Sequence, residues 1–155
     1  MTIIKLDKRH FNEMAQIDFE SEHELEPNFK LSDYKKILKE RITKGDEIFF
    51  GLKDKNIIKG YLSLKPFFPG HKHCEVYWLA VRKRFQKQGI GKKLMFFIEN
   101  YTKKKGFRKV CLYTNKVMKN TRKFYEKIGY KLINEFPNYY GYKKNNTAVL
   151  YGKKL

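Results

Sequence analysis

A glycine-containing turn between a predicted strand and a predicted helix constrains this 155-residue chain more than any other feature. An apolar run at residues 76–81 predicts a strand, and a basic turn with the pattern Gln-x-x-Gly-x-Gly follows at residues 86–91. Apolar residues then recur with the i, i+3, i+4, i+7 spacing of a helix: Leu94, Phe97, Ile98 and Tyr101. The chain therefore contains a strand–turn–helix unit whose turn leads directly into a helix N-terminus.

This unit predicts an anion site. The first backbone N–H groups of a helix have no intrahelical acceptor, and the helix dipole places partial positive charge there. Gly89 and Gly91 let the backbone approach a phosphate without a Cβ in the way. Three lysines add full positive charge: Lys87, Lys92 and Lys93. We therefore expect a pyrophosphate to bind along residues 86–92.

Two common phosphate-binding loops are excluded. A Walker loop requires Gly-Lys-Ser/Thr after its four-residue spacer, and this turn lacks that sequence. The dinucleotide fingerprint Gly-x-Gly-x-x-Gly is also absent, and the turn lies in the middle of the chain rather than after a first strand.

Two segments, in order along the chain, resemble motifs of one family. Residues 79–94, Leu-Ala-Val-Arg-Lys-Arg-Phe-Gln-Lys-Gln-Gly-Ile-Gly-Lys-Lys-Leu, resemble motif A of the GNAT superfamily of acetyl-CoA-dependent N-acetyltransferases. Residues 123–130, Lys-Phe-Tyr-Glu-Lys-Ile-Gly-Tyr, resemble its motif B. The tail, with Asn-Tyr-Tyr at residues 138–140, is similar to the ending of ribosomal-protein and protein N-terminal acetyltransferases. In those enzymes an acidic pair precedes the next alanine, whereas this chain has Asn146-Thr147.

The resemblance implies that acetyl-CoA is the cosubstrate and that no metal is needed. Its pyrophosphate would lie on the turn formed by Gln86, Lys87, Gln88, Gly89, Ile90, Gly91 and Lys92. Its pantetheine would pair with the backbone of the preceding strand, at Leu79, Ala80 and Val81. Many relatives contact the pantetheine through an asparagine seven residues before the motif B tyrosine. That position is Met118 here. Asn115 and Asn120 are the nearest replacements, and we favour Asn120.

Glu75 is the candidate general base. It is the only carboxylate between Asp54 and Glu99, and histone-type members of the family carry a proton-accepting glutamate at this place. Strand alternation puts Tyr77 on the same side, which makes Tyr77 a candidate acceptor-binding residue. Two alternatives remain open: Glu75 pairs with a lysine at the edge of the sheet, or a chain of waters removes the proton.

Tyr125 is the candidate general acid. In relatives, the motif B tyrosine lies near the sulfur of CoA and donates a proton to the departing thiolate. Phe124, Tyr125 and Ile128 also suit the buried face of a helix, so a core role is the alternative. The resemblance of the tail further implies that Tyr139 and Tyr140 border the acceptor entrance.

The charge is distributed unevenly along the chain. The formal net charge is +19, of which residues 1–50 contribute −2 and residues 51–155 contribute +21. Nucleic-acid binding is one interpretation of the basic part. Solvated lysines in a lysine-rich composition are the interpretation we favour. Under either interpretation, the positive charge attracts the phosphates of CoA.

Acidic residues cluster as well. Five of the 16 lie within nine residues, at Asp18, Glu20, Glu22, Glu24 and Glu26. Their alternation favours an exposed loop over a helix face. This loop is either a solvated connector or an acidic lip that attracts a cationic acceptor.

Periodicity and turn residues predict the element order βααβββαβαββ. The expected strands lie at residues 2–6, 47–53, 56–65, 72–82, 109–114, 130–136 and 147–153. The expected helices lie at residues 9–19, 32–42 (with Ser32 as the N-cap), 89–105 and 118–128. This order matches the α/β GNAT fold that the resemblance implies, with a mixed, mostly antiparallel sheet of about seven strands and about four helices. We expect residues 1–155 to form one N-acetyltransferase domain.

Other features suggest a reduced, cytoplasmic protein. Cys74 and Cys111 are too few for a disulfide framework, no run of 18 apolar residues is present, and the first residues lack a signal-peptide layout. His71 and His73 have no second pair at metal-ligand spacing, so we expect no metal. We expect no membrane association, and a monomer or a homodimer.

The predicted activity is transfer of an acetyl group from acetyl-CoA directly to a primary amine. The acceptor is a protein N-terminus, a lysine or a polyamine-like small amine. The alternative is a protein of the same fold that binds CoA or nucleic acid without significant catalysis.

Overall fold

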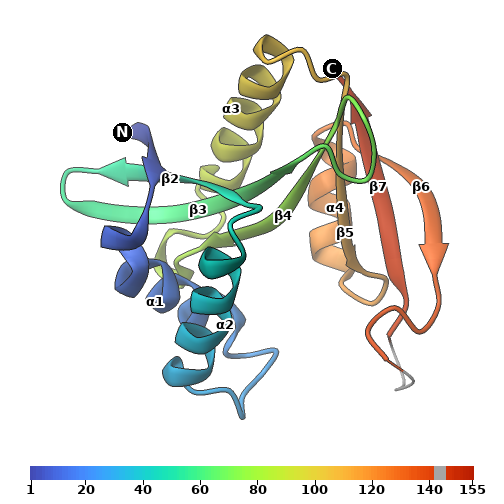
Figure 1. The fold of residues 1–155 in the computed structure, drawn as a ribbon. Helices are drawn as coiled ribbons and strands as arrows, with labels where there is room; N and C mark the ends of the chain where they lie inside the picture. The colour runs from blue at the N-terminus through green and yellow to red at the C-terminus, as the bar shows by residue number, and fades with distance from the viewer. Residues whose placement is uncertain (142–145) are drawn as a thin grey trace. The chain divides into compact units, whose positions relative to one another are not determined.

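A computed structural model describes residues 1–141 and 146–155 of the chain (Figure 1). Its elements are β1 (Thr2–Leu6), α1 (Phe11–Glu22), α2 (Leu31–Lys44), β2 (Ile48–Asp54), β3 (Ile57–Pro66), β4 (His73–Val81), α3 (Ile90–Lys104), β5 (Lys109–Asn115), α4 (Lys119–Lys127), β6 (Lys131–Phe136) and β7 (Ala148–Lys154). Two short 3₁₀ helices, η1 (Lys8–His10) and η2 (Lys83–Phe85), precede α1 and α3. The order of strands and α-helices is the predicted one.

The strands form a mixed sheet of order β1-β2-β3-β4-β5-β7-β6. β4 runs parallel to β5. The pairs β1–β2, β2–β3, β5–β7 and β6–β7 are antiparallel. The described part of the chain thus has the α/β fold that the sequence predicts, with seven strands and four α-helices.

The contacts within the chain divide it into two compact units. Unit 1 comprises Met1–Pro66 and Tyr77–Asn100, and unit 2 comprises Phe67–Val76 and Tyr101–Leu155. β4 and α3 each contribute residues to both units. The single domain expected over residues 1–155 stays a prediction.

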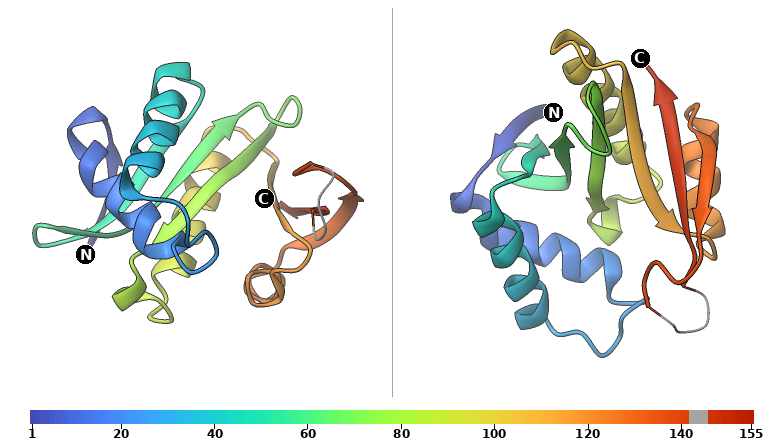
Figure 2. Two further views of the ribbon diagram at one scale, coloured as in Figure 1. Left: turned by 90° about the horizontal axis from the view of Figure 1, so that it is seen from below. Right: turned by 45° about the vertical axis from the view of Figure 1, so that its right-hand side comes forward.

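In unit 1, alternating residues of β2 face two different helical layers. Phe49 joins a core formed with α1 and α2, whose other members include Met14, Ile17, Leu38, Ile58, Tyr61 and Ala80. Phe50, the next residue, contacts Phe97 of α3, with ring centres 5.3 Å apart. Figure 2 shows α1 and α2 on one face of these strands and the first part of α3 on the other. The period-two pattern of the strand therefore places apolar side chains in both cores.

In unit 2, the buried residues come mainly from β5 and β7, with α4 beside them. Among them are Val110, Leu112, Val149 and Tyr151, while most of β6 is exposed. Gly129 ends α4 with a φ of 99°, a left-handed conformation that glycine adopts without strain. This confirms the predicted role of Gly129 as the residue that stops the motif B helix.

Two predicted helix boundaries are wrong. The first helix continues through Glu22 instead of ending at residue 19, so Glu20 and Glu22 lie on α1 and not in a loop. The second helix begins at Leu31, and its N-cap is Lys30 instead of Ser32. The Asp33 carboxylate accepts the backbone N–H of Lys30 at 2.7 Å, which closes the first turn two residues earlier than a cap at Ser32 would.

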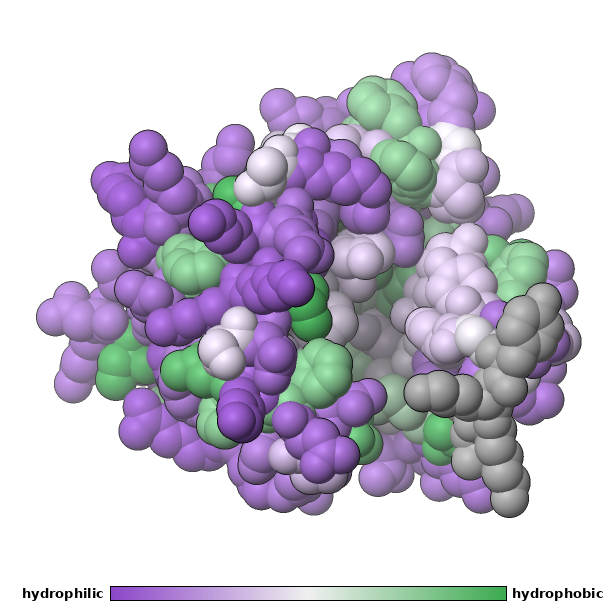
Figure 3. Space-filling model, turned by 60° about the horizontal axis from the view of Figure 1, so that its bottom comes forward, coloured by the Kyte–Doolittle hydropathy of each residue, from purple (hydrophilic) through white to green (hydrophobic). Residues whose placement is uncertain are grey.

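The surface agrees with the high lysine content. In Figure 3, hydrophilic residues cover most of the visible face and hydrophobic residues form separate patches. Within the described residues, no helix is long and apolar enough to cross a membrane.

Candidate active site

The turn after β4 is held by its own glutamine side chains. Nε2 of Gln86 donates to the Val81 carbonyl at 3.1 Å, and Nε2 of Gln88 donates to the Arg84 carbonyl at 3.0 Å. Both predicted cofactor-binding glutamines therefore fold back onto the turn and fix its shape. Their backbone groups, more than their amides, remain available to a ligand.

The turn ends in a helix start with free donors. Lys93 makes the first α-helical bond, to the Gly89 carbonyl at 3.0 Å, so the N–H groups of Ile90, Gly91 and Lys92 have no acceptor within α3. Gly89 has a φ of 79°, and a Cβ there would meet no atom within 4 Å. Lys87 also takes a positive φ, of 59°. The helix start thus offers three N–H groups without an acceptor in α3, next to a glycine with open space around it, and this arrangement fits a pyrophosphate.

Arg82 anchors the beginning of the turn. Its backbone N–H donates to the Lys59 carbonyl at 2.9 Å, and its Nε donates to the Ile58 carbonyl at 2.8 Å. Its terminal nitrogens reach α1, where Nη1 lies 2.8 Å from Glu20 and Nη2 lies 3.3 Å from Glu13. Arg82 is thus neutralised within the protein and holds the turn against α1. The sequence analysis missed this role, although the seven-residue spacing that puts the two glutamates on one helix face could have indicated it.

Gly60 of β3 lets β4 and α3 approach closely. A Cβ on Gly60 would lie 2.9 Å from the Ala80 carbonyl oxygen and 3.2 Å from Cγ2 of Ile90. Ala80 and Ile90 are both buried, whereas Leu79 and Val81 are partly exposed. The first residue of α3 is therefore packed directly against the strand that precedes the turn.

The pairing of β4 with β5 covers only the first residues of β4. The parallel register joins His73, Cys74 and Glu75 to Lys109, Val110 and Cys111. The backbone of residues 79–81 lies outside this ladder. Its polar groups on that edge can therefore pair with an extended ligand, as a pantetheine chain would require.

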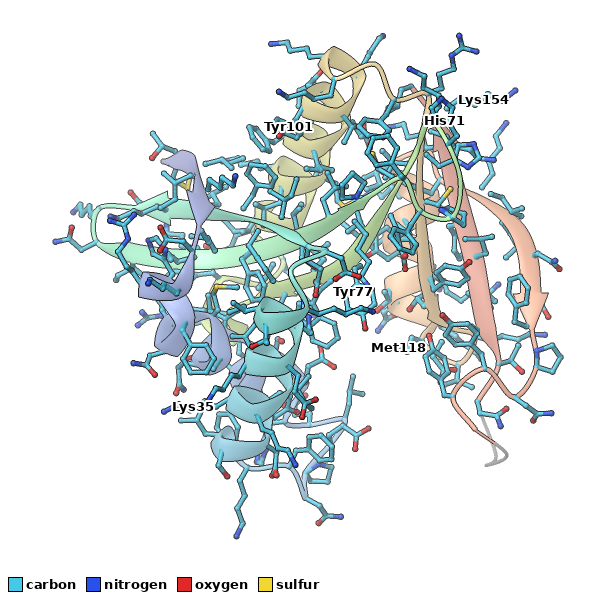
Figure 4. All side chains as sticks on the ribbon, viewed as in Figure 1. Lys35, His71, Tyr77, Tyr101, Met118 and Lys154 are labelled. Carbon is cyan, nitrogen blue, oxygen red and sulfur yellow. The ribbon has the colours of Figure 1, made fainter. Side chains whose placement is uncertain are left out.

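Tyr77 lies among cations in unit 1. Its side chain is 42% exposed, Nζ of Lys65 lies 3.8 Å from its ring centre, and the Arg41 guanidinium lies 5.3 Å away. Figure 4 labels Tyr77 on β4. Arg41 is itself held by a 2.6 Å ion pair with the buried Glu47. The predicted acceptor-binding tyrosine is thus exposed, and both cations near its ring are themselves paired with carboxylates, since Lys65 lies 3.7 Å from Asp46.

Asp18 is a buried carboxylate that the sequence analysis placed in an exposed cluster. It is 3% exposed, and its Oδ1 accepts hydrogen bonds from the Tyr61 hydroxyl at 2.6 Å and from Nε1 of Trp78 at 2.8 Å. Burial raises its pKa from 3.8 to about 6, although these two donors and Arg41 act in the opposite direction. The expectation that all five acids are exposed is wrong for Asp18, because α1 turns it toward β3 and β4.

In unit 2, Glu75 lies in the parallel ladder beside Cys111. Burial, and then the negative charge of Glu75, raises the pKa of Tyr113 on β5. The Tyr113 ring stacks on Tyr139 with centres 5.4 Å apart, and Tyr139 meets Tyr140 edge to face at 5.0 Å. Unit 2 therefore places the candidate base close to an aromatic cluster that contains both predicted acceptor-entrance tyrosines.

Tyr125 is buried in α4. It is 7% exposed, and its ring contacts Phe124 at 5.1 Å and Tyr130 at 5.9 Å between centres. Burial raises the pKa of its hydroxyl above the usual value. The hydroxyl therefore keeps its proton throughout the neutral range, and it is available as a hydrogen-bond donor.

The predicted substitute for the missing asparagine lies on a different face of α4. Met118, labelled in Figure 4, is the N-cap of this helix. Asn120 is exposed and, at 100° per residue, is about 140° around the helix from Tyr125. Thr121 lies one turn before Tyr125, about 40° from it, on the same face. A polar residue on the Tyr125 face is thus present at 121, one position later than expected.

A pocket of about 410 Å³ in unit 1 is a weaker candidate. It is lined by Asp7, Lys8, Arg9, Met14, Ile42, Glu47 and Phe49. Asp7 pairs with Arg9 at 2.7 Å, and Glu47 pairs with Arg41 at 2.6 Å. Its carboxylates are therefore already paired, and nothing in it points to a ligand. Within residues 1–141 and 146–155, no cluster of three or more His, Cys, Asp or Glu side chains is arranged to hold a metal.

Comparison with known proteins agrees with this geometry. Residues 10–130 match the model of the Acetyltransferase (GNAT) family. The chain belongs to this family. A curated relative, the Probable N-acetyltransferase 14 of Xenopus tropicalis, is 32% identical over 96 residues, which is 62% of this chain and 46% of that protein. The chain therefore spans less than half the length of this relative.

Solved structures share the fold over nearly the whole chain. The ribosomal-protein-S18-alanine N-acetyltransferase of Escherichia coli has a TM-score of 0.79 at 17% identity, covering 99% of this chain and 92% of that one. A GNAT family acetyltransferase of Elizabethkingia anophelis with acetyl-CoA bound has a TM-score of 0.75 at 18% identity, covering 99% and 97%. Acetyl-CoA is the acetyl donor of this family, and the open donors at the start of α3 fit its pyrophosphate.

Proposed function

We propose that this acetyltransferase moves the acetyl group of acetyl-CoA directly to a primary amine. The observation that carries the proposal is the helix start after β4, where three N–H groups have no acceptor within α3, Gly89 borders open space and lysines lie nearby in the sequence. Membership of the GNAT family supports the reaction type. Candidate acceptors are a protein N-terminus, a lysine and a polyamine-like small amine.

The reaction requires a neutral amine. At pH 7, removing the proton costs about 4.6 kcal/mol for a lysine-like amine of pKa 10.4 and about 1.4 kcal/mol for an α-amino group of pKa 8. Glu75 is the proposed base for this proton, and its position near Tyr113 supports the assignment, since Tyr113 stacks on Tyr139. A water chain leading to Glu75 would serve the same purpose. The neutral amine then attacks the thioester carbonyl, and the C–S bond breaks.

The departing thiolate of CoA needs a donor, and we assign Tyr125. A thiol has a pKa near 8.5, so a phenol whose pKa is raised by burial stabilises the thiolate by donating a hydrogen bond to it. Complete transfer of its proton to the thiolate would be uphill, because the pKa of Tyr125 lies above that of the thiol. Tyr125 therefore acts mainly as a fixed donor, and the proton of the attacking amine finally reaches the thiolate through solvent.

The remaining cofactor contacts follow the strand and the turn. The backbone of Leu79, Ala80 and Val81 is proposed to pair with the pantetheine. Asn120 stays the proposed amide contact, and Thr121 is added because it shares a helix face with Tyr125. Alanine at either position tests the choice, because only the residue in contact should weaken acetyl-CoA binding.

For the acceptor, we favour a protein or peptide amino group, with small polyamines as the next choice. Tyr139 and Tyr140 support a peptide acceptor, because both are about half exposed and lie in one aromatic cluster with Tyr113. Tyr77 is proposed to contact the same acceptor. The two buried free cysteines suit a reducing compartment, and the cytoplasm is the proposed location.

The test is a release assay for the CoA thiol with a panel of amines and peptides. Gly89→Glu should abolish acetyl-CoA binding measured by calorimetry, because it places a carboxylate where the phosphates lie. Gly89→Ala is the matched control: its Cβ meets open space, so it should retain most of the affinity despite the positive φ. Equal acetyl-CoA affinity in the glutamate variant and the parent would refute the site.

The competing function is CoA or nucleic-acid binding without significant catalysis, which the basic part of the chain favours. It predicts CoA or nucleic-acid binding with no thiol release for any amine in the panel. Thiol release that depends on a particular amine would exclude it.

A further inference from the structure

Arg82, the first residue of the turn after β4, is the centre of a side-chain network that joins three segments. Its Nε donates to the Ile58 carbonyl at 2.8 Å, and its Nη1 donates to Oε1 of Glu20 at 2.8 Å. Its Nη2 lies 3.3 Å from Oε1 of Glu13, and the same oxygen accepts the backbone N–H of Ile58 at 2.8 Å. The Arg82 side chain is 11% exposed. Two carboxylates of α1 therefore fix this arginine against the first residues of β3.

The main chain of Arg82 belongs to the proposed acetyl-CoA site. Its N–H donates to the Lys59 carbonyl at 2.9 Å, and its carbonyl accepts the N–H of Phe85 at 2.8 Å. The carbonyl of Val81, the residue before it, accepts Nε2 of Gln86 at 3.1 Å. The network thus holds the point at which the strand proposed for pantetheine becomes the turn proposed for the pyrophosphate. A shift of the Arg82 side chain would be passed to both backbone segments.

The same helix holds the other end of the strand segment. Asp18 of α1 accepts a hydrogen bond from Nε1 of Trp78 at 2.8 Å. Trp78 and Arg82 directly flank residues 79–81, whose backbone is the proposed pantetheine contact. Carboxylates of α1 therefore hold this segment at both of its ends.

Glu24 and Lys83 form an ion pair of a different kind. Both side chains are well exposed, and the pair joins the loop after α1 to the residue after Arg82. Exposed pairs of this kind contribute little to the structure. The Glu20 side chain, by contrast, is 27% exposed and bonds to an arginine that is almost buried. The chain therefore offers two acids four residues apart, of which only Glu20 belongs to the network.

Charge and geometry predict opposite effects of Glu20 on acetyl-CoA. The ligand carries several negative charges, so removing a carboxylate beside the turn should strengthen its binding by charge alone. Loss of a carboxylate that fixes Arg82 should instead weaken binding, because the backbone donors of the turn must then be ordered by the ligand. A binding measurement therefore tells the two effects apart by their sign.

We propose that Glu20 and Glu13 are positioning residues for acetyl-CoA, and that they act through Arg82 to hold the turn in the conformation that receives the pyrophosphate. In this proposal neither carboxylate contacts the ligand. The inference rests on the proposed function, since it takes the turn as the acetyl-CoA site.

Calorimetry with acetyl-CoA at low salt is the first test. Glu20→Ala should weaken binding about tenfold, because Arg82 loses the shorter of its two ion pairs. Glu20→Gln keeps an oxygen that can accept from Arg82, so its affinity should lie within about threefold of the parent. Glu24→Ala is the matched control: it makes the same charge change and should bind as tightly as the parent or more tightly. Binding by Glu20→Ala as tight as that by Glu24→Ala would overturn the proposal.

A second arm separates positioning from charge and from stability. In about 500 mM salt, the loss in Glu20→Ala should persist, because salt screens charge and not geometry. In an Arg82→Met background, Glu20→Ala should have no further effect on the affinity, since the residue that transmits the effect is gone. A loss that disappears with salt, or losses that add in the double variant, would contradict the proposal. A lower Tm of Glu20→Ala with unchanged affinity would assign the network to the fold alone.

Comparison with Gly89→Glu separates this inference from the proposed function. If Gly89→Glu has no effect on affinity, the acetyl-CoA site itself is wrong and both proposals fall. If Gly89→Glu abolishes binding while Glu20→Ala binds like the parent, only the positioning role is wrong. CoA should show the same losses as acetyl-CoA, because both contain the pyrophosphate that the turn is proposed to hold.

Discussion

Asp18 shows how one buried side chain can set a pH dependence. Its carboxylate accepts hydrogen bonds from Tyr61 and Trp78, and it makes no ion pair with any described residue. Because burial outweighs these donors, the folded protein holds the proton of Asp18 more tightly than the unfolded chain does. A group of this kind stabilises the fold below its unfolded pKa and loses that contribution as the pH rises through the folded value.

For Asp18, this pH window runs from the pKa of 3.8 in the unfolded chain to the pKa of about 6 in the folded protein. Across it, the free energy of unfolding should fall by up to about 3 kcal/mol from this residue alone. Asp18→Asn keeps an oxygen for Tyr61 and Trp78 and removes this contribution. Urea unfolding at pH 4, 5, 6 and 8 should show the variant gaining stability relative to the parent as the pH rises. A constant difference at all four pH values would contradict the assignment, and Glu40→Gln serves as the control.

At Tyr125, the prediction concerns kcat. Tyr125→Phe removes the hydroxyl and keeps the ring contacts with Phe124 and Tyr130, so the fold should be preserved. Loss of the donor to the thiolate should lower kcat by about 10²-fold or more and change the KM for acetyl-CoA little. Steady-state rates with thiol detection measure both constants. A variant within about threefold of the parent would return Tyr125 to a core role.

Single residues also show the limit of prediction from sequence. The spacing of Leu94 and Ile98 predicted a buried helix face, and both are buried. The spacing of apolar residues does not identify the hydrogen-bond or ion-pair partner of a polar residue, because that partner lies in a segment distant in the sequence. Asp18 accepts a hydrogen bond from Trp78, which is 60 residues away in the sequence. Arg82 donates one to Glu13, which is 69 residues away. These pairings decide which acids and bases remain free for a ligand, and only the folded chain reveals them.

The boundaries of helices and strands were predicted to within a few residues where the sequence has a clear apolar period or a glycine at the helix end. α4 ends before Gly129 and α3 before Gly106, both with positive φ, as their sequences indicate. The alternating glutamates predict a loop after residue 19, and this prediction is wrong because α1 continues through Glu22. Arg82 neutralises Glu20 there, which removes the repulsion that would otherwise disfavour the last helical turn.

The packing of α3 against β3 and β4 gives a prediction about Gly60. Gly60→Ala puts a methyl group 2.9 Å from a carbonyl oxygen and against Ile90, so the strand or the helix start must shift. The expected destabilisation is about 1–3 kcal/mol, together with weaker acetyl-CoA binding at the displaced turn. Thermal unfolding and calorimetry measure the two effects.

Gly70→Ala is the control for Gly60→Ala. Its Cβ would lie 3.6 Å from Nδ1 of His73, which is an ordinary contact. Equal stability in both variants would show that β3 and α3 are loosely packed.

The whole molecule carries a net charge of +19, and its ion pairs determine where that charge acts. Arg82 and Lys83 are compensated by acids of the first 50 residues, so Lys87, Lys92 and Lys93 supply the local attraction at the turn. Raising the salt concentration from 50 to 500 mM should increase the KM for acetyl-CoA several-fold, because the charges are exposed and screened. The kcat should change little. A fall in kcat at constant KM would place the salt effect in the chemical step.

The two cysteines bear on redox chemistry and on measurement. Cys74 and Cys111 are buried, and burial raises the pKa of Cys74 to about 12 and raises that of Cys111 as well. Each turnover releases a free thiol, and thiolates exchange with disulfides whereas protonated, inaccessible thiols do not. The protein should therefore resist forming mixed disulfides with oxidised CoA. A thiol-reactive dye added to the folded enzyme will report product with almost no background from the protein itself.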